Sequence, residues 1–468
     1  MTAFTAVALT TAAIVALVVS AMFVPGVAKV FLLAQSAYWS LSYVARPLVL
    51  LWTLPQPQFA DSLADPRLAN IGYDIGIAEV LKPVVFGLWF YVALVVGYVL
   101  FRRWRRGPQE RTTIGAAVAD PYFFRSLGTI YVLGLGGRFV SFATGNTGSA
   151  GEVSSSNPLL DFAATMATVG ALGLIVFARP EKLWQTAVLL LGLMGMELVW
   201  TVIVESKTPV LGAALAVAVR FALIGWTRGT ILGVLGISAG AIGAFGILQS
   251  LKVDPEARAI SAAAEASYPP VVQPFLPILR RFDLLEAATD AYYMQGREWI
   301  SHGDVVKNAL LNFIPSQLLG SEKFQSGTAW ANQVRGSSVD MRNVSVSLAE
   351  GNISEGFVFG GYAGVAVTMT FTFVMVLVAV RWLLARNFLF VVLGLTLIEY
   401  PVLFERGILG TTESIGKSLQ LAILVWIVTL LVGEYSRQCA ETPPPTTHVP
   451  DDISTLDRSS SKGSASWV

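Results

Sequence analysis

Cysteine, histidine and charged residues are all scarce in this chain of 468 residues. The single cysteine, Cys439, excludes an intramolecular disulfide and argues against a cysteine-based metal site. The two histidines, His302 and His448, exclude a multi-histidine metal site. Charged residues make up 13% of the chain, whereas an ordinary soluble domain has about 25%. The composition is therefore not that of a soluble protein.

Sequence signatures of nucleotide chemistry are also missing. The chain has no glycine-rich phosphate loop of the GxxxxGKS or GxxxxGKT type. The acidic pair Asp451-Asp452 lies in the C-terminal tail, and no DxD-like cluster lies in the segments expected outside the membrane. The formal net charge of +1 says nothing about partners, and nothing in the sequence indicates nucleic acid.

Apolar residues, in contrast, make up 54% of the chain, and the mean hydropathy is +0.62. Runs of about 20 apolar residues recur along the sequence, and each is long enough to cross a bilayer as a helix. Such runs must be helical because the hydrocarbon core offers the backbone no water. We predict an all-α polytopic membrane protein with about 11 transmembrane helices, near residues 5–23, 28–53, 83–101, 123–143, 159–178, 185–204, 210–225, 230–250, 356–380, 387–404 and 417–433.

Basic residues in the short loops set the expected orientation. The segment 102–106 carries four arginines and is the strongest cytoplasmic marker. The basic loops 179–182 and 381–386 fall on the same side, and the loop 145–157 on the opposite side has no basic residue. The first span lacks a basic n-region and reads as a span rather than a cleaved signal peptide. We predict the N-terminus outside and the C-terminus in the cytoplasm.

The predicted domain organisation is one transmembrane domain, 1–438, followed by a disordered cytoplasmic tail, 439–468, which is rich in Pro, Thr, Ser and Asp. The polar stretch 251–355 interrupts the apolar runs and is predicted to form a large external loop. Amphipathic patterns within it predict short helices that lie flat on the membrane and roof a cavity. These helices are expected at 254–266, 274–295 and 304–313.

Cations near the outer ends of spans are the first candidates for a binding site. A charge at the membrane edge is costly and often functional; the alternatives are snorkelling to the interface or pairing with a carboxylate. Guanidinium forks suit phosphate oxygens, and a lipid diphosphate would lie at this depth. An arginine pair on the loop helix would close over it, unless that pair is simply solvated. The diphosphate-binding candidates are Arg46, Arg138, Lys207, Arg280, Arg281 and Arg406.

The second group of candidates surrounds the point where the loop re-enters the membrane. Glu355 precedes three glycines at four-residue spacing, which is a pattern of close helix packing. A carboxylate at the top of such a helix is expected to have a raised pKa and to act as general base towards a sugar hydroxyl. Asp283 and His302 are competing base candidates, and His302 also reads as a plain surface residue.

Four features together resemble the oligosaccharide repeat-unit polymerases, the Wzy-like O-antigen polymerases of bacterial surface polysaccharide pathways. One is the sequence SYVARPL at 42–48, and another is SKTP at 206–209. The third is a large external loop late in the chain. The fourth is Glu355-Gly356 followed by further glycines. Lys207 stands where that family usually has arginine, and a lysine holds phosphate as a single point charge rather than by two prongs.

The resemblance implies a reaction and a location. Such enzymes join repeat units carried on undecaprenyl diphosphate at the outer face of the cytoplasmic membrane, without a metal or cofactor. The basic candidates would hold the diphosphate leaving group. Glu355, with Asp283 and His302 behind it, would deprotonate the acceptor hydroxyl. The expected partners are the lipid-linked oligosaccharide and the membrane, with a chain-length regulator and a flippase as further candidates.

Other functions fit the same architecture. An O-antigen ligase-like transferase would use the same donor, and dependence on His302 would distinguish it. A membrane protein that polymerises peptidoglycan glycan has a similar number of spans. A transporter of lipid-linked glycan would be expected to contain internal repeats, and no such repeat is visible in this sequence.

Overall fold

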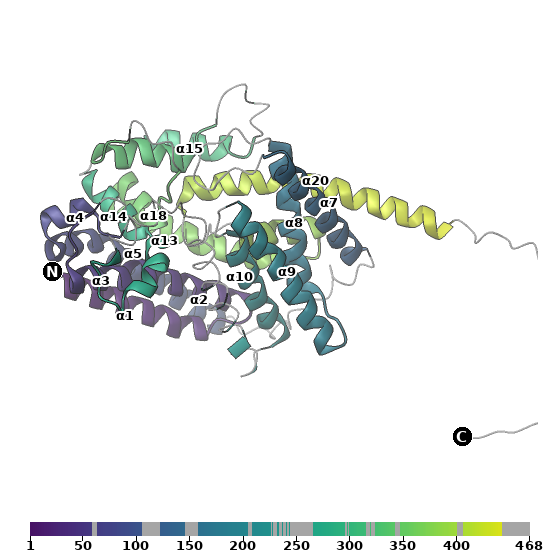
Figure 1. The fold of residues 1–468 in the computed structure, drawn as a ribbon, viewed down its shortest axis with the longest axis horizontal. Helices are drawn as coiled ribbons and strands as arrows, with labels where there is room; N and C mark the ends of the chain where they lie inside the picture. The colour runs from purple at the N-terminus through teal and green to yellow at the C-terminus, as the bar shows by residue number, and fades with distance from the viewer. Residues whose placement is uncertain are drawn as a thin grey trace, which may run out of the picture.

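A computed structural model describes residues 1–58, 63–104, 122–145, 158–204, 208–225, 265–294, 299–314, 323–341, 347–399 and 406–441, with isolated residues between them (Figure 1). Every regular element within these ranges is helical. The predicted tail, 439–468, and the eighth predicted span, 230–250, lie almost wholly outside the described residues, as does the predicted loop helix 254–266. The described part therefore has the all-helical class that the sequence predicts.

In the part of the chain that the structure describes, seven helices are long and apolar enough to cross a membrane, and this confirms a multi-pass helical architecture. Two shorter apolar helices accompany them: α10 (Thr208–Ile224) and α19 (Phe388–Glu399). The number of eleven spans remains a prediction. The seven are α1 (Ala3–Met22), α5 (Tyr73–Trp104), α7 (Phe123–Ala143), α8 (Pro158–Phe177), α9 (Leu183–Ile203), α18 (Asn352–Leu383) and α20 (Ile408–Glu441).

The second predicted span is continuous but irregular. It consists of α2 (Val27–Ser40), one π-helical turn η1 (Leu41–Ala45) and α3 (Arg46–Thr53). Pro47 has no N–H to donate and its ring crowds the preceding turn, so a wider turn just before it relieves the clash. This irregular turn places Arg46 at the junction.

The sequence-based prediction places the start of the third span too late. α5 begins at Tyr73 rather than at residue 83, and Pro83 lies inside the helix. The polar residues Glu79 and Lys82 hide this first part of the helix in the sequence, but they form an ion pair of 2.5 Å one turn apart. That pairing lets both charges stay on the helix.

The helices form two packed groups, each around its own apolar core. α1, α2 and α5 make the first group, and α7, α8, α10 and α19 make most of the second. In Figure 1 the first group (purple and blue) lies at one end of the molecule, and α20 (yellow) extends beyond the other end. Gly134 and Gly137 of α7 lie directly against Ala167 and Ala163 of α8, where a Cβ would clash, so the two spans pack closely.

α18 is a helical hairpin rather than one straight helix. Its backbone leaves helical geometry at Gly360 and at Gly361, and Gly361 has φ 57° and ψ −139°. Gly356 and Gly364 lie against each other across the bend. Eight residues of straight helix would separate these two glycines by about 12 Å. The chain therefore turns back on itself at the Gly360-Gly361 pair.

The hairpin corrects the predicted ninth span, 356–380. Asn352 Nδ2 donates to Thr372 Oγ1 at 3.2 Å, which joins the start of the first arm to the middle of the second. The glycines do mediate close packing as expected, but between two antiparallel arms rather than along one helix face. A period-four pattern is compatible with both arrangements, so the sequence could not separate them.

Part of the long loop is folded into the bundle. The described residues of the loop contain η2 (Gln273–Phe275), α13 (Leu276–Arg281), α14 (Leu284–Tyr293), α15 (His302–Leu311), α17 (Ser326–Ala329), η3 (Trp330–Val334) and η4 (Arg335–Ser337). The predicted helix 274–295 is broken into α13 and α14. Seven residues of α14 are buried, against α5, α18 and η1, so the prediction that it lies flat on the membrane is wrong.

α15 begins slightly earlier than predicted. Ser301 is its N-cap, and its Oγ accepts from the backbone N–H of Asp304 at 3.2 Å. Asp304, the predicted start, is instead in the first turn, where its charge still suits the helix dipole. α15 has no buried residue and lies along one edge of the molecule (Figure 1).

Candidate functional site

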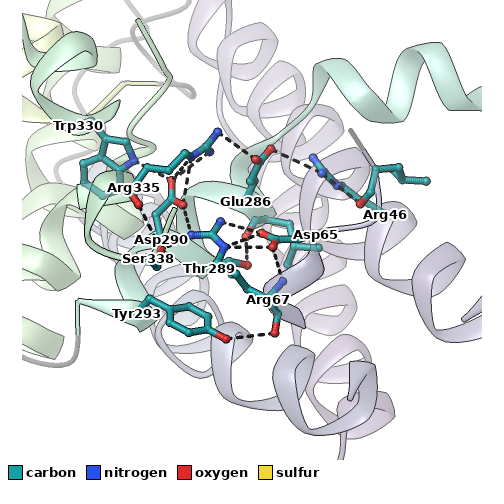
Figure 2. Close-up of polar contacts among 12 residues, drawn as sticks. Arg46, Asp65, Arg67, Glu286, Thr289, Asp290, Tyr293, Trp330, Arg335 and Ser338 are labelled. Carbon is teal, nitrogen blue, oxygen red and sulfur yellow. Dashed lines mark hydrogen bonds and ion pairs between the residues drawn. The ribbon is translucent and has the colours of Figure 1, made fainter. Parts of the chain in front are cut away.

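Six charged side chains meet around α14 and are called the α14 network below (Figure 2). They come from three segments that are far apart in the sequence: α3, the short helix α4 (Pro66–Ile71) with its cap, and the long loop. Three are arginines and three are carboxylates, so their formal charges balance. The members are Arg46, Asp65, Arg67, Glu286, Asp290 and Arg335.

Asp290 is the centre of the network and is fully buried. Its carboxylate lies 2.8 Å from Arg67 Nη1 and 3.0 Å from Arg335 Nη2. It also accepts a hydrogen bond of 3.1 Å from Trp330 Nε1. A buried carboxylate is stable only with such partners, and here two guanidiniums and an indole supply them.

Arg67 joins the network to the segment that follows the second span. Its guanidinium pairs with Asp65 at 2.7 Å and donates to Ser338 Oγ at 2.7 Å. Asp65 also caps α4 by accepting from the Arg67 backbone N–H at 2.8 Å. Burial disfavours the charge of Arg67, but the hydrogen bonds and attraction of Asp65 and Asp290 outweigh it and raise its pKa. Arg67 is therefore a fixed cation.

Glu286 forms the open edge of the network. Its carboxylate lies between Arg335, at 3.0 Å from Nη1, and Arg46, at 3.8 Å from Nη2. Its side chain keeps 25% exposure, whereas that of Asp290 has none. Burial raises the pKa of Glu286, and the two arginines oppose that rise. Arg46 is held further by the Leu63 carbonyl, which accepts from Nη2 at 3.3 Å.

Glu355 lies at a different place, against the start of α20. Its carboxylate accepts from the backbone N–H of Ile408 and, at 3.2 Å, from that of Leu409. The first N–H groups of a helix need acceptors and attract negative charge. Gly407 has no Cβ, which leaves room for the carboxylate. These contacts of Glu355 anchor the start of α20 to the α18 hairpin.

Further charges surround the start of α20. Glu350 is fully buried, and its burial raises its pKa while the nearby charge of Arg406 opposes the rise. Glu413 accepts from Ser326 Oγ at 3.4 Å and pairs with Lys417 at 2.8 Å. The predicted candidates Glu355 and Arg406 thus belong to one neighbourhood, apart from the α14 network.

Arg138 is enclosed among α7, α8 and α9. Both terminal nitrogens pair with the carboxylate of Glu197, at 2.9 and 2.8 Å. Nη2 also donates to Thr168 Oγ1 at 2.5 Å, and the guanidinium lies 4.9 Å from the Trp200 ring. The side chain is 4% exposed. The sequence left three interpretations of Arg138 open: a functional cation, snorkelling to the interface, or pairing with a carboxylate. The structure shows pairing with a carboxylate.

The remaining predicted residues are scattered. Arg280 pairs with Glu265 at 2.6 Å. Asp283 precedes α14 and acts electrostatically on Glu286. His302 is exposed, at the start of α15 and close to Gly360 of the hairpin. Lys207 and the side chain of Arg281 lie outside the described residues.

Sequence reasoning missed Asp65, Arg67 and Asp290. Asp65-Pro66 fits the pattern of a capped helix start with proline in the first turn, so a short helix was predictable there. Asp290 stands among alanines in an apolar stretch, and buried aspartates are rare unless paired. Nothing in the sequence, however, indicates that Asp290 is the partner of Arg67, because the two are more than 200 positions apart.

Among the described residues no group of three or more His, Cys, Asp or Glu side chains is arranged to hold a metal ion. Comparison with known proteins gives no relative: no family model, no curated protein and no solved structure matches this chain.

Proposed function

We propose that this protein is a membrane glycosyltransferase that polymerises undecaprenyl-diphosphate-linked oligosaccharide repeat units at the outer face of the cytoplasmic membrane. The observation that carries the proposal is the open edge of the α14 network. There a partly exposed carboxylate, Glu286, lies between Arg46 and Arg335. Two guanidiniums that share one exchangeable anion can also hold phosphate oxygens.

The network supplies the binding half of the reaction. The donor's diphosphate displaces Glu286 and is held by Arg46 and Arg335. The inner pairs of Asp290 with Arg67 and Arg335 keep the guanidiniums in position. As the bond between the sugar and the diphosphate breaks, charge grows on the leaving oxygen, and fixed cations stabilise it best where water is scarce.

Asp283 is the base candidate that best fits this site. It lies close enough to Glu286 to act on it electrostatically. The Glu355 carboxylate, in contrast, already accepts two backbone N–H groups of α20, which suits a positioning role. In the proposed step, Asp283 accepts the proton of the acceptor hydroxyl. The hydroxyl oxygen then bonds to the anomeric carbon as the diphosphate leaves.

A reconstituted assay tests the proposal directly. Purified full-length protein is incubated with lipid-linked repeat units from its own host, and product length is read on gels. Arg335→Ala is expected to abolish polymer, and Arg335→Lys to restore little because one ammonium cannot replace a two-pronged guanidinium. Lys307→Ala, on the exposed face of α15, is the control and should polymerise normally.

Other outcomes would redirect the assignment. Normal polymer from folded Arg335→Ala would remove the α14 network from the reaction. Polymer of normal length that stays on its lipid in a deletion strain would indicate a ligase-like transferase, and dependence on His302 would strengthen that reading. No glycan change in the deletion strain would remove the proposal altogether.

One observation favours a second candidate, a transporter of lipid-linked glycan. The α18 hairpin is a broken helix packed inside a bundle, and transporters build substrate sites at such breaks. Vesicles with the protein and fluorescent lipid-linked glycan distinguish the two functions. Translocation of the glycan without any increase in its length would favour the transporter.

A further inference from the structure

A cavity of about 280 Å³ lies between α5, α14 and the α18 hairpin. Its walls include Val80 and Val84 of α5, Ala288 of α14, and Ile353 of the first hairpin arm. The volume is near the lower end for ligand sites, which span about 300–1,000 Å³. It has room for a group the size of one ring rather than for a whole oligosaccharide.

Aromatic side chains form one side of the cavity. Tyr292, Phe357 and Tyr362 line it, and the last two meet edge to face with centroids 5.7 Å apart. Tyr362 also meets Phe86 edge to face at 5.2 Å and remains exposed. These rings present flat apolar surface together with two phenolic hydroxyls, a combination suited to a ligand with both apolar and polar faces.

Two charged groups of α5 also line the cavity. Glu79 and Lys82 form an ion pair there, with side chains 37% and 40% exposed. The carboxylate would repel an anion and the ammonium would repel a cation, so the pair favours a neutral ligand. Together the two groups offer acceptors and donors to hydroxyls. A purely apolar ligand would form no hydrogen bond with either group.

The cavity borders the two elements that carry the α14 network and Glu355. Ser354 lines it and is next to Glu355 in the first hairpin arm. Ala291 lines it and follows Asp290, the centre of the α14 network. Successive residues of an α-helix are about 100° apart, so Ala288, Ala291 and Tyr292 line the cavity from the face of α14 opposite to Glu286 and Asp290. The cavity and the α14 network therefore share this one short helix.

We infer that this cavity binds a single sugar ring of the incoming, acceptor-side repeat unit. The apolar face of the ring packs on Tyr362 and Phe357, and its hydroxyls hydrogen-bond to Glu79, Lys82 and Tyr292. That the sugar belongs to the acceptor rests on the proposed function, whereas the binding of a neutral sugar rests on the cavity alone.

Saturation-transfer-difference NMR tests the binding. The full-length protein in detergent is titrated with methyl glycosides of glucose, galactose and N-acetylglucosamine. At least one glycoside is expected to bind, and Tyr362→Ala and Glu79→Gln are each expected to weaken it about three- to tenfold. The control is Phe139→Ala, which removes an exposed ring on α7 and should bind as the wild type does. Tyr362→Leu replaces Tyr362→Ala if the latter lowers the unfolding temperature.

Two results would overturn the inference: no glycoside of the panel binds, or the bound glycoside is indifferent to both cavity variants. Transfer of lipid-linked repeat units is measured on the same preparations. Cavity-dependent glycoside binding without any transfer would support the sugar site and remove the proposed function. Transfer that is unchanged in both cavity variants would overturn the assignment of the cavity to the acceptor and leave the proposed function.

Discussion

Two regions of this molecule bury arginine against carboxylate, and they do so differently. Between α7, α8 and α9, Arg138 and Glu197 form a closed two-pronged pair with 4% and 0% exposure. Around α14, the charges are spread over segments from α3 to η4, and Glu286 remains partly exposed. The first region joins neighbouring spans, and the second joins the N-terminal spans to the long loop.

The difference separates a structural charge from a candidate site. A closed pair has no position left for a third charged group, and its removal leaves a buried charge. The α14 network has a buried centre, a partly exposed edge and a cavity on the same helix. A fully buried ion pair is therefore weaker evidence of a functional site than a buried network of charges that also has a solvent-exposed edge.

The largest effect is expected from Asp290→Ala. The change leaves Arg67, Arg335 and the Trp330 indole without their shared acceptor. Loss of one partner of a buried pair costs about 3–5 kcal/mol, so we expect a strongly lowered thermal unfolding midpoint in detergent and no polymer. A midpoint close to that of the wild type would show that the network does not hold the loop in place.

The closed pair is expected to behave as an interchangeable structural unit. Glu197→Leu alone should destabilise by about 3 kcal/mol or more because Arg138 is left buried and unpaired. Adding Arg138→Met should restore most of that loss, since apolar replacement of a whole buried pair is often neutral. The measurement is a double-mutant cycle of unfolding midpoints. Polymer yield per folded molecule should stay normal in the double variant, and its loss would give this pair a functional role.

The turn of the α18 hairpin, at Gly360 and Gly361, gives a smaller effect. Gly361 has φ 57° and ψ −139°, a conformation that side-chain-bearing residues adopt at a cost of about 1–3 kcal/mol. Gly361→Ala should therefore lower the unfolding midpoint and the glycoside affinity together. Gly360→Ala is the matched control because its φ of −166° is ordinary and its nearest neighbour, His302, lies 3.8 Å from the new Cβ. Equal loss in both variants would contradict a specific role for the turn.

The spans were the predictable part of this chain. The span predicted at 123–143 has the same bounds as α7, because an apolar run of sufficient length has one stable form in a bilayer. The start of α5 and the α18 hairpin were not predictable. In α5 the polar residues hide the helix, and in α18 glycines at period four fit a straight helix and a hairpin equally well.

The candidate site was only partly predictable, for a different reason. Arg46 was identifiable as a charge inside a span, and it does reach the α14 network. Arg138 carried the same signal and lies in the closed pair instead. The sequence shows that a charge is buried, but the partner depends on which helices pack together, and no pattern along the chain encodes that. Asp290 and Arg67 were missed for this reason.

The smallest effect, and the sharpest contrast with the closed pair, is expected from Glu286→Gln. Burial raises the pKa of Glu286 in the folded protein above its unfolded value of about 4.3. Between these two values the folded protein holds a proton that the unfolded chain has released, so stability falls as the pH rises through that window. Glutamine carries no charge at any pH and lacks this slope. The variant should thus be slightly more stable than the wild type at pH 7, and the gap should close below about pH 4.3.

Neutralising Glu286 is tolerable because its arginines keep other partners. Arg335 still pairs with Asp290, and Arg46 still donates to the Leu63 carbonyl. Glu197→Gln leaves Arg138 with the Thr168 hydroxyl and the Ala164 carbonyl but without its ion-pair partner. This variant should lose stability at pH 7, so the same chemical change has opposite effects on stability in the two regions. Glu286→Gln should also bind undecaprenyl diphosphate more tightly, measured by thermal shift, because the competing anion is gone. A destabilised variant with unchanged or weaker diphosphate binding would make Glu286 a structural partner like Glu197.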